Sequence, residues 1–204
     1  MNYKVLIAAT LVGAIVHAEP ALDPLPEGYL PMGPVDGRTM EGVCDAGVDT
    51  ALAAAGQDNI SIYCGMAEPS FGGWMRTLDA EPYRGRRVRY SAWIKGAGIE
   101  DAGGPDQPVI GSASLWIAVG SPSRGSLMDN LGDQSIRGHT SWEYREVVVD
   151  VPEDSRRILP GFWVRGKGQL WIRDQVLEVV SDSVPATLFW EERQNRPGPN
   201  LSLE

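Results

Sequence analysis

The feature that most constrains the fold is a two-residue alternation of apolar and polar side chains in short runs. It is clearest in Val88–Lys95, Ser112–Val119, Trp142–Val151 and the two runs inside Ile158–Val180, which flank Gly166-Lys167-Gly168 and read as a hairpin. Such alternation is typical of half-buried β-strands, because successive side chains point to opposite faces. Turn-forming residues separate the runs, so the sequence predicts roughly eight short strands.

Helical signals are nearly absent. Asp49 has the character of a helix N-cap, but the alanine-rich segment after it, Thr50–Ala55, allows at most two turns before Gly56. A parallel α/β fold is disfavoured because it needs amphipathic helices. The predicted fold class is therefore all-β, an antiparallel β-sandwich of the jelly-roll kind with little helix.

The chain has 204 residues and is expected to form one domain with irregular ends. Lys4, the apolar run Val5–Val16 and the small-residue site ending at Ala18 have the form of a secretory signal, with an uncleaved anchor as the weaker alternative. We expect residues 1–18 to be a signal peptide, 19–34 a proline-rich lead-in, 35–192 the sandwich and 193–204 a flexible tail. The mature protein is then exported, periplasmic or secreted, and has no membrane span.

Net charge and cysteine content limit which ligands and partners the protein is expected to have. The net charge of −9 becomes −10 without residues 1–18, whose one charged side chain is Lys4, so nucleic acid is not an expected partner. Cys44 and Cys64 are the two cysteines, and export permits a disulfide between them, with two free thiols as the alternative. A cysteine-based metal site needs more ligands than the mature chain's single histidine, His139, can add. No metal or cofactor is expected.

Catalytic motifs are weak. The Gly120–Gly125 segment lacks the G-x-S-x-G spacing of a nucleophile elbow, and His139 falls in a polar loop without an obvious orienting partner. Glu143 and Glu146 are three residues apart on a predicted strand and should point to opposite faces, which does not suit a glycosidase pair. We therefore expect a protein that is not an enzyme.

Four tryptophans lie on the polar side of their strands. Trp116 is bordered by small side chains that should leave its face open. An indole beside hydrogen-bonding groups suits the apolar face of a sugar ring, and it also attracts cations. The expected contacts with a glycan or other small ligand are, in order of preference, Trp116 and Trp163, followed by Trp171, Trp93, Arg165 and Arg173.

Two structural interpretations compete with a binding platform. The tryptophans can divide between the two sheets, or the proline-rich segment can cover them as a second core layer. In that case the protein is a structural or protein-interaction module of the cell envelope without a small-molecule ligand. The sequence leaves both possibilities open.

Several segments match a known sequence pattern: Thr77–Ala80, Tyr83–Ala92, Leu115–Trp116, Asp129–Asn130, Ile136–Thr140 with Trp142, Val148–Pro152 and Gly166–Trp171. Through these segments the chain from Tyr83 onward resembles galactose-binding-like, carbohydrate-binding-module-type jelly rolls, which occur in bacterial exported proteins and attached to AraC-type regulators. The resemblance implies the jelly-roll fold and no catalytic residue. Related modules often carry a structural calcium, but Arg173-Asp174-Gln175-Val176 replaces the usual Asp-Asp-Val and argues against it.

Overall fold

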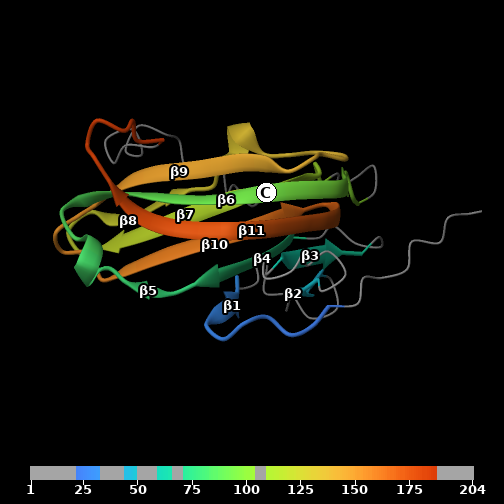
Figure 1. The fold of residues 1–204 in the computed structure, drawn as a ribbon, viewed down its shortest axis with the longest axis horizontal. Coiled ribbons are helices and arrows are strands. Elements are labelled where there is room, and N and C mark those ends of the chain that lie inside the picture. The colour runs from blue at the N-terminus through green and yellow to red at the C-terminus, as the bar shows by residue number, and fades with distance from the viewer. Residues whose placement is uncertain (1–21, 33–43, 50–58, 66–70, 104–108, 188–204) are drawn as a thin grey trace, which may run out of the picture.

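The computed structural model describes residues 22–32, 44–49, 59–65, 71–103 and 109–187. They form a sandwich of two antiparallel sheets whose long strands run along the long axis of the molecule (Figure 1). The predicted all-β jelly-roll class is confirmed. The predicted signal peptide, the C-terminal tail and the short helix after Asp49 lie outside the described residues.

One sheet has six strands in the order β1-β4-β10-β7-β8, with β5 pairing with β10. Its strands are β1 (Tyr29–Pro31), β4 (Phe71–Arg76), β5 (Leu78–Asp79), β7 (Ser112–Ser121), β8 (Gly125–Asp129) and β10 (Arg157–Arg165). Tyr29–Pro31 of the proline-rich lead-in thus forms an edge strand, β1. It brings the end of the proline-rich segment onto the sheet.

The other sheet has five strands in the order β2-β3-β11-β6-β9. Its strands are β2 (Cys44–Val48), β3 (Ile60–Cys64), β6 (Arg86–Glu100), β9 (Glu143–Val151) and β11 (Lys167–Val180). Two single-turn 3-10 helices, η1 (Glu81–Tyr83) and η2 (Gly132–Gln134), are the helical segments of the described ranges. No helix in these ranges has the length and apolar character needed to cross a membrane.

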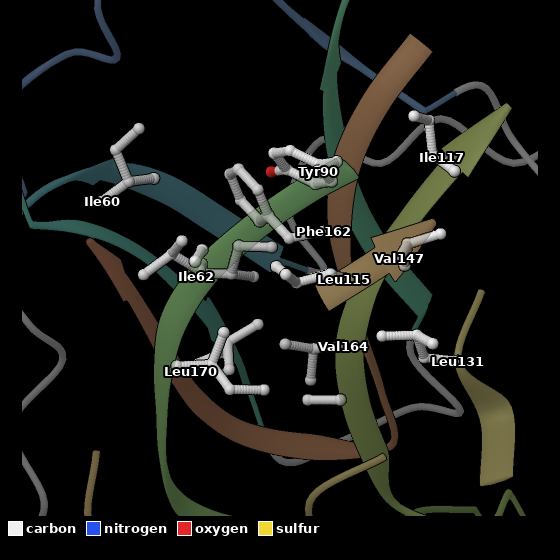
Figure 2. Close-up of a cluster of buried hydrophobic side chains, with 14 of the residues drawn as sticks. Ile60, Ile62, Tyr90, Leu115, Ile117, Leu131, Val147, Phe162, Val164 and Leu170 are labelled. Carbon is white, nitrogen blue, oxygen red and sulfur yellow. The ribbon is translucent and has the colours of Figure 1, made fainter. Parts of the chain in front are cut away.

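The main core lies between the sheets. In Figure 2, Ile62 and Leu170 of the five-stranded sheet meet Leu115, Phe162 and Val164 of the six-stranded sheet. All five side chains are completely buried. The apolar parity predicted for these strands is therefore the face that packs inward.

The predicted disulfide is present. Cys44 and Cys64 are direct partners of β2 and β3, and their sulfurs are bonded. The bond packs against Gly72 of β4 in the opposite sheet, where a β-carbon would come within 2.6 Å of Cys44 Sγ. Glycine at this position lets the disulfide lie between the sheets as part of the core.

The predicted hairpin over Ile158–Val180 is wrong. Its two strands, β10 and β11, are separated only by Gly166 but belong to different sheets. Gly166 has φ +84° and lies against the backbone of Glu100 and Gly111, where a β-carbon would overlap Glu100 O. A residue with a side chain is poorly suited to this corner, and the chain crosses there from one layer to the other.

Two stretches rich in glycine and polar residues, which are typical of loops, contain strands. The glycine- and aspartate-rich stretch 96–111 begins as strand, because β6 continues to Glu100 opposite Lys167. The stretch 120–140 contains β8, whose Leu127 is buried in the core. The local sequence of β8 is polar, so its pairing with β7 outweighs its own weak strand preference. Residues Arg38–Cys44 also have the alternating pattern of a strand, but of these the structure describes Cys44 alone.

A β-bulge in β11 reverses the predicted side-chain parity. The register with β6 shifts between Arg173 and Val176, and Asp174 at the bulge has φ +53°. As a result Val176, which has the same sequence parity as the core residues Leu170 and Ile172, is 45% exposed. The bulge places Gln175 between two tyrosines: Tyr90 Oη donates to Gln175 Oε1 at 2.8 Å, and Gln175 Nε2 donates to Tyr29 Oη at 2.8 Å.

Candidate functional site

The four tryptophans on the polar side of their strands project away from the main core, as predicted, but they lie on two different faces of the sandwich. Trp116 and Trp163 lie on the outer face of the six-stranded sheet. Trp93 and Trp171 lie on the outer face of the five-stranded sheet. The sandwich therefore has two separate aromatic surfaces.

Trp116, Trp163 and Ala118 form what we call the indole cluster, a small second core outside the six-stranded sheet. Trp116 is 4% exposed and Trp163 is 7% exposed. The expectation that small neighbours leave Trp116 open is wrong, because the cover comes from other parts of the chain. The partly buried residues packed on the cluster are Met32, Phe71, Met75 and Leu159.

Two glycines on the same face allow large side chains to lie close to the sheet. Gly161 is the cross-strand partner of Trp116, and the indole lies so near it that a β-carbon on Gly161 would overlap the ring. Gly73, the partner of Trp163 on the other side, is covered in the same way by the thioether of Met32. The cluster therefore depends on glycine at these two positions, Gly73 in β4 and Gly161 in β10.

Polar atoms in the indole cluster are only partly paired. Trp163 Nε1 donates to the backbone oxygen of Asn130 at 3.2 Å. Trp116 Nε1 and Ser114 Oγ are buried, and within the described part of the chain neither has a hydrogen-bond partner. Ser114 is the cross-strand partner of Trp163 and precedes Trp116 by two residues, so the two unpaired groups share one face.

Further groups border the indole cluster. The ring of Phe71 stacks on Trp163 with centroids 6.3 Å apart and planes inclined by 21°. Arg165, paired with Phe71 across the strands, is exposed at the end of the same face. Phe71 and Ser114 were not among the predicted contacts. Ser114 has the same parity as Trp116 and could have been found from the sequence, whereas Phe71 reaches the site only through pairing between distant strands.

On the opposite sheet, six side chains form what we call the aromatic-cation face: Lys95, Trp93, Trp142, Tyr144, Trp171 and Arg173. Lys95 Nζ lies 5.2 Å from the ring centre of Trp171, and the Arg173 guanidinium lies 4.5 Å from that of Trp142. Trp93 and Tyr144, which are cross-strand partners, meet edge to face at 5.7 Å. Trp93 is 38% exposed and Tyr144 is 42% exposed.

Trp171 is the anchored member of this face. It is 8% exposed, and its Nε1 donates to Asp49 Oδ2 at 2.7 Å. Asp49 is itself buried. This hydrogen bond joins β11 to the chain just beyond β2, so the indole of Trp171 is fixed while that of Trp93 remains open to solvent.

The carboxylates do not converge as a catalytic pair. Glu143 pairs with Arg145 at 2.5 Å, whereas Glu146 pairs with Arg89 at 3.4 Å and accepts from the hydroxyl of Tyr144 at 3.1 Å. This agrees with the predicted opposite faces of the two glutamates. His139 is exposed.

Metal ligands are not gathered in the described ranges, where no three His, Cys, Asp or Glu side chains lie together in a way that could hold an ion. Asp174, the carboxylate at the position compared with related calcium sites, has its Oδ2 3.6 Å from Arg173 Nε. One carboxylate facing a guanidinium does not fit a calcium site, which needs six to eight oxygen ligands.

An open cavity of roughly 670 Å³ lies at one end of the sandwich, lined by both cations and carboxylates. Asp154 on its rim accepts from the hydroxyl of Ser121 at 2.7 Å and from the backbone N–H of Ser123 at 2.8 Å. These bonds, that of Ser121 first, lower the pKa of Asp154 to about 2. They fix the turn between β7 and β8, which is a structural role.

The chain is similar to one curated protein in sequence and to several solved structures in fold. The chain is 36% identical over 118 residues to an uncharacterized HTH-type transcriptional regulator, YbfP, of Bacillus subtilis. The match covers 57% of this chain and 37% of the regulator, so the chain spans about a third of the length of that relative. No protein-family model matches the chain.

Comparison with solved structures finds similar folds at low sequence identity. The CBM22-1 and GH10 modules of Clostridium thermocellum endo-1,4-β-D-xylanase 10B, complexed with xylohexaose, superpose with a TM-score of 0.51 at 13% identity, over 79% of this chain and 28% of that one. The CBM22-1 xylan-binding domain of Paenibacillus barcinonensis Xyn10C gives 0.48 at 12% identity, over 80% and 99% of the two chains. The first likeness shows that the two proteins share a β-sandwich fold.

Proposed function

We propose that the protein is an exported, non-catalytic module that binds a glycan at the indole cluster, with Trp116 and Trp163 as the principal contacts. The observation that carries this proposal is the pair of unpaired polar groups, Trp116 Nε1 and Ser114 Oγ, beside two indoles on one sheet face. A ligand with both C–H faces and hydroxyl groups matches this combination.

The energetic reason lies in the cost of burial. A buried donor or acceptor without a partner costs about 1–3 kcal/mol, and native proteins leave few of them. A sugar hydroxyl accepts from the indole N–H and exchanges a hydrogen bond with the Ser114 hydroxyl, while the ring packs on the indoles. Binding at this site therefore gives hydrogen-bond partners to two buried groups that lack them, Trp116 Nε1 and Ser114 Oγ.

Access to the cluster requires its cover to move. Met32 and Phe71 are partly buried over the indoles. Met32 belongs to the chain leaving the short edge strand β1, and methionine readily adopts other rotamers. We propose that a bound sugar displaces Met32 from Gly73 and takes its place against Trp163.

Export and the lack of catalysis belong to the same proposal. Residues 1–18 have the form of a signal peptide, and a disulfide is typical of proteins in oxidising compartments. Among the described residues, Glu143, Glu146 and Glu178 are held in ion pairs with arginine rather than facing each other across a cleft. The arrangement is suited to binding.

The test is binding of xylohexaose, followed by a panel of other β-1,4-linked hexasaccharides, measured by affinity electrophoresis and calorimetry. Trp116→Ala and Trp163→Ala should each weaken the best interaction about 30-fold, since truncating a central aromatic contact costs about 2 kcal/mol. Ile110→Ala, an exposed apolar residue on a loop, is the control and should bind normally. Undiminished binding in both tryptophan variants would contradict the proposal.

The alternative function is a structural or protein-interaction module of the envelope. The near-complete burial of Trp116 beneath the side chains packed on it favours this alternative. Acrylamide quenching separates the two: the fluorescence that Trp116→Phe removes should be strongly quenchable if the cluster opens and weakly quenchable if it is a permanent core. Failure of the whole glycan panel together with weak quenching selects the alternative.

A further inference from the structure

The aromatic-cation face of the five-stranded sheet is separate from the proposed glycan site. It lies on the other side of the sandwich, with the main core between. Two of its aromatic rings, those of Trp93 and Tyr144, are among the large apolar side chains with the greatest exposure in the described part of the chain. Exposed aromatic patches on a soluble domain commonly mark interaction sites.

Strand register sets the layout of the face. Trp171 pairs with Lys95 in one row, and Arg173 pairs with Trp93 in the next, which continues to Tyr144 on β9. Rows on one side of a sheet are two residues apart, about 7 Å, and neighbouring strands are about 4.8 Å apart. Lys95 and Arg173 therefore lie beside Trp93 on two sides, one along its strand and one across.

Charge on this face is unevenly balanced. Glu146 and Glu178 both pair with Arg89, at 3.4 and 2.7 Å, and Asp174 faces Arg173. Asp49 is buried and accepts from the indole of Trp171. Within the described ranges Lys95 has no carboxylate within 4 Å, and its ammonium group rests near the Trp171 ring. The face thus combines open aromatic rings with a cation that is not neutralised by an ion pair.

We infer that this face is a second binding site, specific for a saccharide that carries a carboxylate, with Trp93 stacking on the sugar ring and Lys95 pairing with the carboxylate. A neutral sugar gains the stacking contact alone, while an acidic sugar also gains a charge-assisted hydrogen bond. Arg173, whose guanidinium lies 4.5 Å from the ring centre of Trp142, borders the site on the other side of Trp93. The chemistry recognised is that of a uronic acid within a glycan.

The experiment compares trigalacturonate with α-1,4-galactotriose, which has the same linkage and ring stereochemistry but a hydroxymethyl group in place of each carboxylate. Calorimetry at low salt should find trigalacturonate bound about tenfold more tightly, the size of one charge-assisted contact. Its affinity should fall as salt is raised, because part of the pairing is exposed to solvent. Equal affinity for the two trisaccharides, or no trigalacturonate binding, overturns the inference.

Substitutions test whether Lys95 and Trp93 form the site that binds trigalacturonate. Lys95→Gln should abolish the preference for trigalacturonate, and Trp93→Ala should abolish its binding. Arg124→Gln removes the same unit of charge at the turn between β7 and β8 and serves as the control. Loss of trigalacturonate binding in Trp116→Phe but not in Lys95→Gln places the acid at the indole cluster and overturns the inference, while leaving the proposed glycan function intact.

Discussion

The indole of Trp116 lies directly over Gly161, its partner across β7 and β10, with Nε1 and Cε2 as the ring atoms nearest the β-carbon position. A β-carbon at Gly161 would overlap the ring, so the pair fits only because one residue has no side chain. An aromatic ring packed over a strand glycine also shields that part of the sheet from water. This contact fixes where the indole N–H points and defines the base of the indole cluster.

Gly161→Ala should therefore destabilise the protein by about 1–3 kcal/mol through overpacking and force Trp116 outward. Urea unfolding measures the loss, and a red shift of the tryptophan emission reports the displaced indole. Gly120→Ala is the matched control, since it lies on β7 with no heavy atom near its β-carbon position. Similar losses in the two variants would show that the contact does not matter.

Removal of the disulfide should also be costly. The double substitution of Cys44 and Cys64 by alanine releases a crosslink between residues 20 apart. In the chain-entropy model this lowers the free energy of unfolding by roughly 3 kcal/mol, and loss of packing against Gly72 adds to it. Chemical denaturation of both proteins gives the difference. Two titratable thiols in the unreduced, denatured wild-type protein would contradict the assignment.

The hydrogen bond from Trp171 to Asp49 should stabilise the five-stranded sheet. Asp49→Ala leaves the buried indole N–H without its acceptor and should cost about 1–3 kcal/mol. The cost should shrink when Trp171 is already phenylalanine, because the donor is then absent. Asp45→Ala, which removes an exposed aspartate of β2, is the control. An unchanged cost in the Trp171→Phe background would argue against the pairing.

Asp154 should contribute to stability in a pH-dependent way. Its pKa in the folded protein is about 2, below its ordinary value of 3.8. A carboxylate with a lowered pKa stabilises the fold fully above the unfolded value, and the contribution is lost as pH falls toward the folded value. The stability difference between wild type and Asp154→Asn should thus shrink from pH 4 to about 2. Titration of the Asp154 carboxyl by NMR with a midpoint near 3.8 would refute this.

Sequence alternation predicted the parity of the tryptophans but not their neighbours. Trp93, Trp116, Trp163 and Trp171 all point away from the main core because parity is a local property of a strand. The burial of Trp116 depends on residues such as Met32, which arrives from another part of the chain. Local sequence carries no record of such contacts.

Strand partners and bulges account for the remaining differences. Gly166 between two alternating runs looks like a hairpin, yet its backbone contacts turn the chain into the other sheet. The bulge at Asp174 cannot be recognised from alternation alone, and it exposes Val176. The aromatic-cation face likewise forms only when β6, β9 and β11 pair, so Tyr144 and Trp142 were not predicted as neighbours of Trp93.

The proposed function requires the unpaired indole N–H of Trp116 to donate a hydrogen bond to a bound glycan. The most direct measurement follows the indole N–H signals in ¹H–¹⁵N spectra during titration with xylohexaose and then with the rest of the β-1,4-linked panel. The N–H signal of Trp116 should move downfield as the group gains an acceptor, and the signal of Trp163 should shift with it. The signal of Trp74, on the core side of β4, should not change. Shifts confined to Trp93 and Trp171, or none with any member of the panel, would contradict the account.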